Sequence, residues 1–228
     1  AIKNLQERGY KILEGKTARM GDGKGISTDP KVTSAELLQF YKDDSIDAII
    51  SAGGGELMNE TITHVDFDEL RNCKPKWFIG YSDNTNFIFP LVTISRTMGI
   101  YGPCTNGYGK NWEDTENDAF ALLEGRRAEF KGYDMYSFND APSDPEAAID
   151  YDKLMNYDLN MKKELKSFDC SSKKAVEVDD SVKLSCNGIL LGGCLDVLTN
   201  ICGTRFDRVK EFKEEYKEDK LCEGLPEE

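Results

Sequence analysis

Residues 76–85 read KWFIGYSDNT, and this stretch decides the fold. Its apolar beginning predicts a buried strand of a parallel sheet, Gly80 ends the apolar run, and residues 86–92 predict a helix. A strand, a tight turn and a helix in this order can hold a serine on a strained corner with its hydroxyl exposed. Ser82 is therefore a candidate nucleophile, and the N–H groups at the start of the helix are candidate donors to an oxyanion. The simpler alternative is that Ser82 or Asp83 only caps the helix, since both residue types are favoured there.

A second buried strand is predicted at residues 46–51, and three consecutive glycines, Gly53, Gly54 and Gly55, follow it directly. Glycines at the end of a strand let the backbone approach a ligand closely and expose its N–H groups. Ligand sites of open α/β sheets lie at the carboxyl ends of the strands, so this loop and the turn at Ser82 are expected to face one site. A dinucleotide fingerprint is a weak alternative because the GxGxxG spacing is absent.

Two other features are candidates for chemistry, and both favour an ordinary interpretation. The glycine-rich residues 21–25 lack the GxxxxGK[ST] spacing of a phosphate loop, so a surface loop is predicted there. His64 is the only histidine and hence the only imidazole base that the sequence offers. It lies close to Ser82 in sequence, whereas triad partners are usually far apart, so a surface or packing role is predicted for it.

Composition narrows the class of protein. A chain of 228 residues with 39% hydrophobic and 31% charged residues suits a soluble globular protein, and its acidity fits a cytoplasmic one. The net charge of −13 argues against nucleic-acid binding, and no apolar run is long enough to predict a membrane span. The cysteines number seven, form no CxxC pair and stand beside a single histidine, so we expect reduced thiols and no metal site. No cofactor is predicted.

The remaining pattern divides the chain into three parts: an N-terminal α/β domain at 1–105, a linker with variable loops at 106–184, and part of a C-terminal domain at 185–228. Helices are predicted at 1–9, from 27–30 to 44, at 56–60, 66–72 and 119–123, and as a solvated face at 162–166. Strands are predicted at 10–13 and 99–103. Residues 185–204 predict a strand, a tight turn and an apolar helix ended by Gly203, with glycines in packing roles, and a polar tail without strands follows from 206.

Several short motifs together resemble the LD-carboxypeptidase family, and most closely its MccF-like branch of serine peptidases that give self-immunity to microcin C. The resemblance covers most of 1–105 and 186–212. The motifs that carry it are, in order, Gly54-Gly55, Asp66-Phe67-Asp68, FIGYSDNT at 78–85, Tyr101-Gly102-Pro103, GGCL at 192–195 and Gly203-Thr204.

The resemblance implies a Rossmann-like or flavodoxin-like N-terminal domain with a mostly parallel sheet, a smaller C-terminal domain and a homodimer. It implies Ser82 as the nucleophile of a Ser-His-Glu triad, with the main-chain N–H groups of Asp83, Gly54 and Gly55 as the oxyanion hole. The implied reaction is hydrolysis of an amide next to a free carboxylate. The implied substrate is either a small peptide, namely the murein L,D-tetrapeptide, or an aminoacyl-nucleotide toxin of the microcin C type.

The chain departs from the family pattern because no histidine follows Ser82. Glu223, Glu227 and Glu228 do not match the glutamate strand of the family, so no triad Glu or His is assigned. We expect a chain truncated at both ends and nearly inactive, since loss of a triad member costs several orders of magnitude in rate. Two alternatives to a hydrolase stay open: a non-catalytic module that binds a carboxylate or phosphate on the same scaffold, and a nucleotide-binding domain, which the phosphate-loop spacing disfavours.

Overall fold

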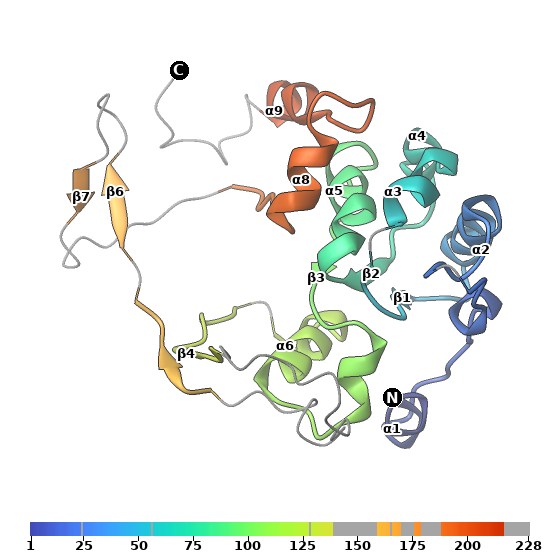
Figure 1. Ribbon diagram of the computed structural model, residues 1–228, viewed down its shortest axis with the longest axis horizontal. Coiled ribbons are helices and arrows are strands. Elements are labelled where there is room, and N and C mark those ends of the chain that lie inside the picture. The colour runs from blue at the N-terminus through green and yellow to red at the C-terminus, as the bar shows by residue number, and fades with distance from the viewer. Residues whose placement is uncertain are drawn as a thin grey trace. The chain divides into compact units, whose positions relative to one another are not determined.

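The computed structural model describes residues 1–23, 25–55, 57–127, 129–138, 159–164, 166–169, 176–178 and 188–216 (Figure 1). The chain divides into two compact units. Unit 1 comprises Ala1–Ala128 and Leu190–Glu215, and unit 2 comprises Glu129–Ile189 and Tyr216–Glu228. All residues that were predicted to form the site lie in unit 1.

The centre of unit 1 is a parallel sheet of three strands, β1 (Ala48–Ile50), β2 (Trp77–Gly80) and β3 (Ile100–Tyr101), in the order β1-β2-β3. Ile49 lies opposite Phe78, and Ile79 lies opposite Ile100. The strands end at the same edge, because parallel strands run in one direction. The predicted α/β fold class and its parallel sheet are confirmed.

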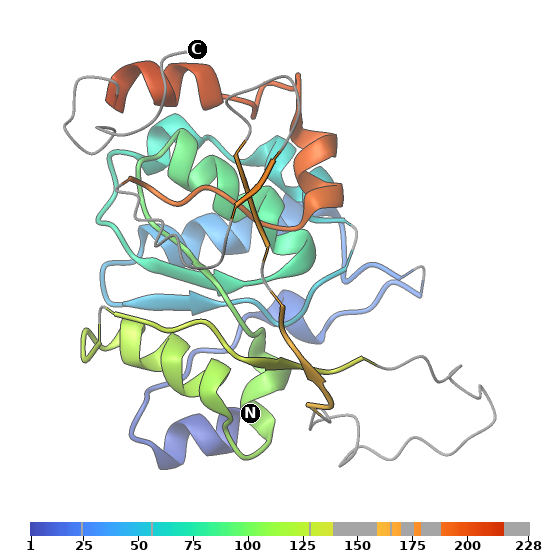
Figure 2. The same ribbon diagram turned by 90° about the vertical axis from the view of Figure 1, so that its left-hand side faces the viewer.

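Helices cover both faces of this sheet, as Figure 2 shows. Phe78 packs in a cluster with Tyr41, Leu70 and Phe87 from helices on one face. The next residue, Ile79, points to the other face and packs with Ala119. Successive side chains of a strand point to opposite faces, so an uninterrupted apolar run on β2 is what a sheet covered on both sides requires.

The described helices are α1 (Ile2–Glu7), α2 (Pro30–Lys42), α3 (Met58–Thr61), α4 (Phe67–Leu70), α5 (Thr85–Thr93), α6 (Asp114–Leu123), α8 (Leu195–Ile201) and α9 (Val209–Tyr216), with 3₁₀ turns η1 (Lys16–Arg19), η2 (Ile62–His64), η3 (Ser82–Asn84) and η4 (Thr105–Gly109).

Local sequence signals explain where several helices begin. Asp29 caps α2 by accepting a hydrogen bond of 2.8 Å from the N–H of Lys31, and Pro30 occupies the first helical position. Asp66 caps α4 in the same way through the N–H of Glu69, at 3.0 Å. The predicted helices at both places are confirmed.

Unit 2 contains two small antiparallel sheets among its described residues. Strand β4 (Met135–Tyr136) pairs with β5 (Met161–Lys162), and β6 (Ser167–Asp169) pairs with β7 (Val176–Val178). The predicted helical face at 162–166 is therefore wrong, because its first residue belongs to β5 and the N–H of Lys163 donates to the carbonyl of Asp134 at 2.7 Å.

Two further predicted strands are also wrong. Residues 10–13 join no sheet; instead the ring of Tyr10 packs edge-on against Phe120 with centroids 5.1 Å apart. The strand predicted at the start of 185–204 is also absent from its described residues 188–191, where Leu190 is 90% exposed. Each segment has the apolar composition of a strand, but an apolar run forms a strand only where it pairs with another strand.

The polar tail predicted from 206 contributes to the core after all. The ring of Phe206 packs edge-on against Phe67 with centroids 5.9 Å apart, and Phe212 of α9 is buried. Glu215 of α9 pairs with both Arg71 and Arg96. Helix α8 packs against α5, so this late part of the sequence completes unit 1 (Figure 1).

Candidate active site

Ser82 lies on the corner between β2 and α5 in a backbone conformation that serine rarely adopts. Its φ is +59°, which places it in the left-handed region. A non-glycine residue there costs on the order of 1–3 kcal/mol and persists only where the surrounding structure enforces it. The preceding Tyr81 is extended, and the turn η3 leads directly into α5. Ser82 is half-buried, so its side chain reaches the surface of unit 1.

The capping alternative for these residues is wrong in its simple form. Neither η3 nor α5 has a side-chain hydrogen bond at its N-cap. Asp83 instead turns toward the neighbouring loop, where its Oδ2 accepts a hydrogen bond of 2.7 Å from the N–H of Met58 at the start of α3. Its Oδ1 accepts one of 2.8 Å from Asn86. The carboxylate of Asp83 therefore connects α3 to the corner.

Neighbouring groups enforce the strained corner. The main-chain N–H of Ser82 donates to the hydroxyl of Tyr101 at 3.1 Å, which ties the corner to the end of β3. A Cβ at Gly80 would lie 2.7 Å from Cγ of Asn84, so only glycine leaves room for that side chain. The glycine that ends the predicted strand thus has a packing reason.

The glycine loop after β1 lies directly beside Ser82. A Cβ built on Gly54 would be 3.3 Å from Cβ of Ser82 and 3.6 Å from its Oγ. Gly55 has a φ of +153° and faces the carboxylate of Asp83. The structure therefore brings together all four residues that were predicted for the site, and the two loops lie side by side, while their roles stay predictions.

Main-chain N–H groups are available around Ser82. Within the described part of the chain, those of Gly54, Gly55 and Asp83 donate to no acceptor. Donors of this kind, aimed at the place where a negative oxygen forms, are what an oxyanion hole needs. Behind them lies the thiol of Cys104, which is fully buried, and burial raises its pKa. This thiol is therefore protonated near neutral pH and adds no charge to the site.

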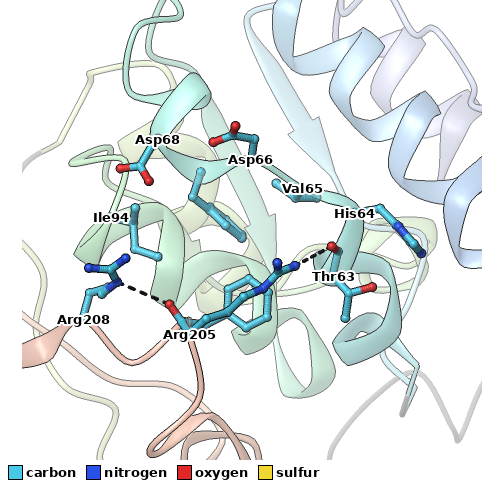
Figure 3. A pocket seen from close by; sticks show the side chains of 10 residues that line it. Thr63, His64, Val65, Asp66, Asp68, Ile94, Arg205 and Arg208 are labelled. Carbon is cyan, nitrogen blue, oxygen red and sulfur yellow. Dashed lines mark hydrogen bonds between the residues drawn. The ribbon is translucent and has the colours of Figure 1, made fainter.

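His64 lies elsewhere in unit 1. It is exposed at the end of η2 and lines a cavity of about 410 Å³ together with Asp66, Arg205 and Arg208, and Ser82 is not among the lining residues (Figure 3). Figure 3 shows Arg205 reaching the carbonyl of Thr63, with which it forms a hydrogen bond. The surface role predicted for His64 agrees with this position.

Residues 21–23 and 25 belong to a loop, as predicted. Glu223, Glu227 and Glu228 lie outside the described residues, and so does Glu56 of the helix predicted at 56–60, of which the structure has α3. Among the described residues, no group of His, Cys, Asp and Glu side chains is arranged to hold a metal ion.

Sequence reasoning missed the contact that residues 192–194 make with the first turn of α5. A Cβ at Gly193 would lie 2.3 Å from Cγ2 of Thr85, and the N–H of Cys194 donates to Oγ1 of Thr85 at 2.9 Å. The packing role predicted for the glycines here is confirmed for Gly193, while Gly192 has open space around it. Asn84 and Tyr101 were also missed as supports of the corner, although both lie in the motifs that carry the family resemblance.

None of the helices in the described part of the chain combines the length and the apolar character that crossing a bilayer requires.

Known proteins match this chain in sequence and in structure. Residues 1–102 match the family model of the LD-carboxypeptidase N-terminal domain. The microcin C7 self-immunity protein MccF of Escherichia coli is 24% identical over 208 residues, which are 90% of this chain and 56% of MccF. The "Probable murein peptide carboxypeptidase" of Bacillus subtilis (strain 168) is 30% identical over 106 residues, which are 45% of this chain and 32% of that protein.

Solved structures of MccF share the fold. MccF in complex with glutamyl sulfamoyl guanosine superposes with a TM-score of 0.59 at 22% identity, and MccF in complex with aspartyl sulfamoyl adenosine with a TM-score of 0.57 at 21% identity. Each comparison covers 90% of this chain and 57% of MccF. The chain thus spans little more than half the length of this relative. The resemblance to the LD-carboxypeptidase family is confirmed, and residues 1–102 are the part of the chain that matches the family's N-terminal domain.

Proposed function

We propose that Ser82 is the nucleophile of a serine hydrolase of the LD-carboxypeptidase type. The observation that carries the proposal is the φ of +59° at Ser82, on a corner where Gly54, which has no side chain, lies beside its Oγ. In the reaction, Oγ would bond to the carbonyl carbon of an amide, the amine would leave with a proton, and water would then release the acid from the ester. The N–H groups of Asp83, Gly54 and Gly55 would donate to the carbonyl oxygen while it carries negative charge.

The relatives supply the substrate class. One is named a murein peptide carboxypeptidase, and MccF has been solved with aminoacyl sulfamoyl nucleosides. We propose an amide next to a free carboxylate in a small substrate, either a murein L,D-tetrapeptide or an aminoacyl-nucleotide of the microcin C type. We propose a cytoplasmic homodimer for the protein, as the family resemblance implies, and no membrane or nucleic-acid partner.

The rate of catalysis by these 228 residues alone is limited by whether a general base lies near Ser82. The only histidine is His64, and it lines a cavity that does not include Ser82. A serine without a base is a weak nucleophile, although an oxyanion hole alone retains about 10³–10⁴-fold catalysis over water in a well-studied protease. We therefore propose that this chain turns substrate over very slowly while Ser82 keeps measurable reactivity.

Covalent labelling tests the proposal. A fluorophosphonate transfers its phosphonyl group to Oγ of an activated serine, releasing fluoride and the hydroxyl proton. We expect slow labelling at Ser82, detected by peptide mass spectrometry and abolished in Ser82→Ala. Ser45→Ala is the matched control, because Ser45 is exposed and, among the described residues, bonds only to Asp43. Labelling spread over several serines, or unchanged in Ser82→Ala, would refute a nucleophilic Ser82.

A binding module without catalysis is the second candidate. It is favoured by the N–H groups of Gly54, Gly55 and Asp83, which donate to no acceptor among the described residues, since such groups bind a carboxylate or phosphate whether or not a base is present. Isothermal titration with inorganic phosphate and with a D-alanine-terminated peptide distinguishes the two. Saturable binding without any labelling of Ser82 would favour the binding module.

A further inference from the structure

We propose that Asn84 is the positioning residue that fixes the glycine loop against the nucleophile corner. The inference rests on the function proposed above, because it concerns the distance between Ser82 and its oxyanion donors. Asn84 is 1% exposed and therefore does not touch substrate itself. It acts through the two backbone segments that meet around it.

The side-chain amide of Asn84 joins these segments directly. Its Nδ2 donates to the carbonyl of Gly53 in the glycine loop at 3.0 Å and to the carbonyl of Tyr81 on the corner at 3.0 Å. It also lies 3.6 Å from Sγ of Cys104. One nitrogen therefore fixes how far the loop stands from the residue before Ser82.

The glycine loop has one other side-chain contact that holds Gly53. The hydroxyl of Ser51 donates to the same carbonyl at 2.7 Å, but both residues lie on the β1 side of the gap. Within the described residues, the hydrogen bond from Asn84 is the one that links Gly53 to the corner. Gly54 and Gly55 have no side chains with which to hold themselves in place.

The acceptor side of the amide indicates what the residue is for. Oδ1 of Asn84 is buried and has no hydrogen-bond partner among the described residues. A buried acceptor without a partner costs about 1–3 kcal/mol, so an asparagine here is unfavourable unless its donors matter. Reversing the amide would place the oxygen against two carbonyls and the nitrogen where no acceptor lies, so the network assigns the orientation.

The neighbourhood is shaped to admit this side chain. Gly80 lies under it, and any Cβ there would come within 2.7 Å of Cγ of Asn84. An apolar side chain of similar size fits the same space but cannot donate. Leucine at this position therefore tests the donor, and aspartate tests its charge.

Second-order rates of fluorophosphonate labelling at Ser82 test the role. We expect Asn84→Leu to label at least about tenfold more slowly than wild type, because even small misplacement of reacting groups has large effects on rate. Asn84→Asp should be as slow at pH 8 and should recover relative to wild type as the pH falls, since only a protonated carboxyl can donate to Gly53. Ser95→Ala is the control, because Ser95 is a buried side chain that donates to the carbonyl of Phe67 at 2.6 Å.

If Asn84 only stabilised the fold, Asn84→Leu and Ser95→Ala would label Ser82 at equal rates whenever their melting temperatures were equal. Slower labelling of Asn84→Leu at an equal melting temperature therefore supports the positioning role. Unchanged labelling in both Asn84 variants would overturn it. If wild type itself does not label, the proposed nucleophile fails, and backbone ¹⁵N order parameters decide the positioning role separately. We expect the order parameters of residues 53–55 to fall in Asn84→Leu and to stay unchanged in Ser95→Ala; no change in either variant would refute the role of Asn84.

Discussion

Replacing Gly54 with alanine is the substitution that most directly tests the geometry of the site. The new methyl carbon would stand 3.3 Å from Cβ of Ser82 and 3.6 Å from Oγ. The φ of Gly54 lies outside the left-handed region, so alanine adopts this backbone without strain. The methyl group would occupy the space beside the hydroxyl, where a substrate carbonyl would have to lie.

The expected effect separates stability from reactivity. An alanine in a permitted conformation restricts the unfolded chain and stabilises by about 0.4–1 kcal/mol, which offsets a contact that is only a few tenths of an ångström too close. We therefore expect the free energy of unfolding of Gly54→Ala to lie within about 1 kcal/mol of wild type. Labelling of Ser82 should fall by about 10- to 100-fold, which corresponds to about 1.4–2.7 kcal/mol in the activation free energy.

The preceding glycine supplies a matched control. A Cβ at Gly53 would meet no atom within 4 Å, and Gly53 also avoids the left-handed region. Gly53→Ala makes the same chemical change one residue away in open space, so it should label at the wild-type rate. Urea unfolding followed by tryptophan fluorescence gives the stability of both variants. Equal labelling rates for Gly54→Ala and Gly53→Ala would refute the placement of this loop beside the nucleophile.

Three further predictions concern the scaffold. Lys76→Met should lower the free energy of unfolding by about 2–4 kcal/mol in urea titration, because the buried Nζ donates to three main-chain carbonyls at 2.6–3.2 Å; a change near zero would contradict this role. Burial raises the pKa of Glu36, but hydrogen bonds from the hydroxyl and N–H of Thr17, together with the N–H and charge of Lys16, outweigh burial and hold the pKa below its ordinary value of 4.5. The carboxylate therefore adds stability above about pH 4.5 that is lost as the pH falls through its folded-state pKa, and Glu36→Gln should flatten that acid limb of the melting temperature. Gly193→Ala should destabilise by about 1–3 kcal/mol, since its Cβ would lie 2.3 Å from a methyl carbon of α5 at a φ of +151°, whereas Gly192→Ala meets open space and should melt like wild type.

The parts of the fold that the sequence predicted correctly depend on neighbours along the chain. The apolar run of the strand ends at Gly80, the short corner at Ser82 interrupts it, and a second apolar run forms the helix that follows. The glycines after β1 mark a loop for the same reason, and parallel pairing then places both loops at one edge of the sheet. Such features can be read from sequence because each rule spans only a few residues.

The features that were missed depend on contacts between distant residues. Nothing near Gly193 indicates that its backbone lies against Thr85, and nothing near Tyr101 indicates that its hydroxyl accepts the N–H of Ser82. The strand predicted within 185–204 is absent from residues 188–191 for the same reason, because an apolar run becomes a strand only where another strand pairs with it. The domain bounds at 105 and 184 and the roles of the site residues stay predictions.

The core of unit 1 is drawn from two separated stretches of sequence, and this has a consequence for biosynthesis. Phe67 is covered by Phe206, whose ring lies 5.9 Å away but which is synthesised only after the whole intervening segment. Until Phe206 has been synthesised and has packed, the ring of Phe67 in the nascent chain lacks this contact. The ring of Phe67 is therefore unprotected from the time it is synthesised until Phe206 packs against it. The newly made protein should be most prone to aggregate during that interval.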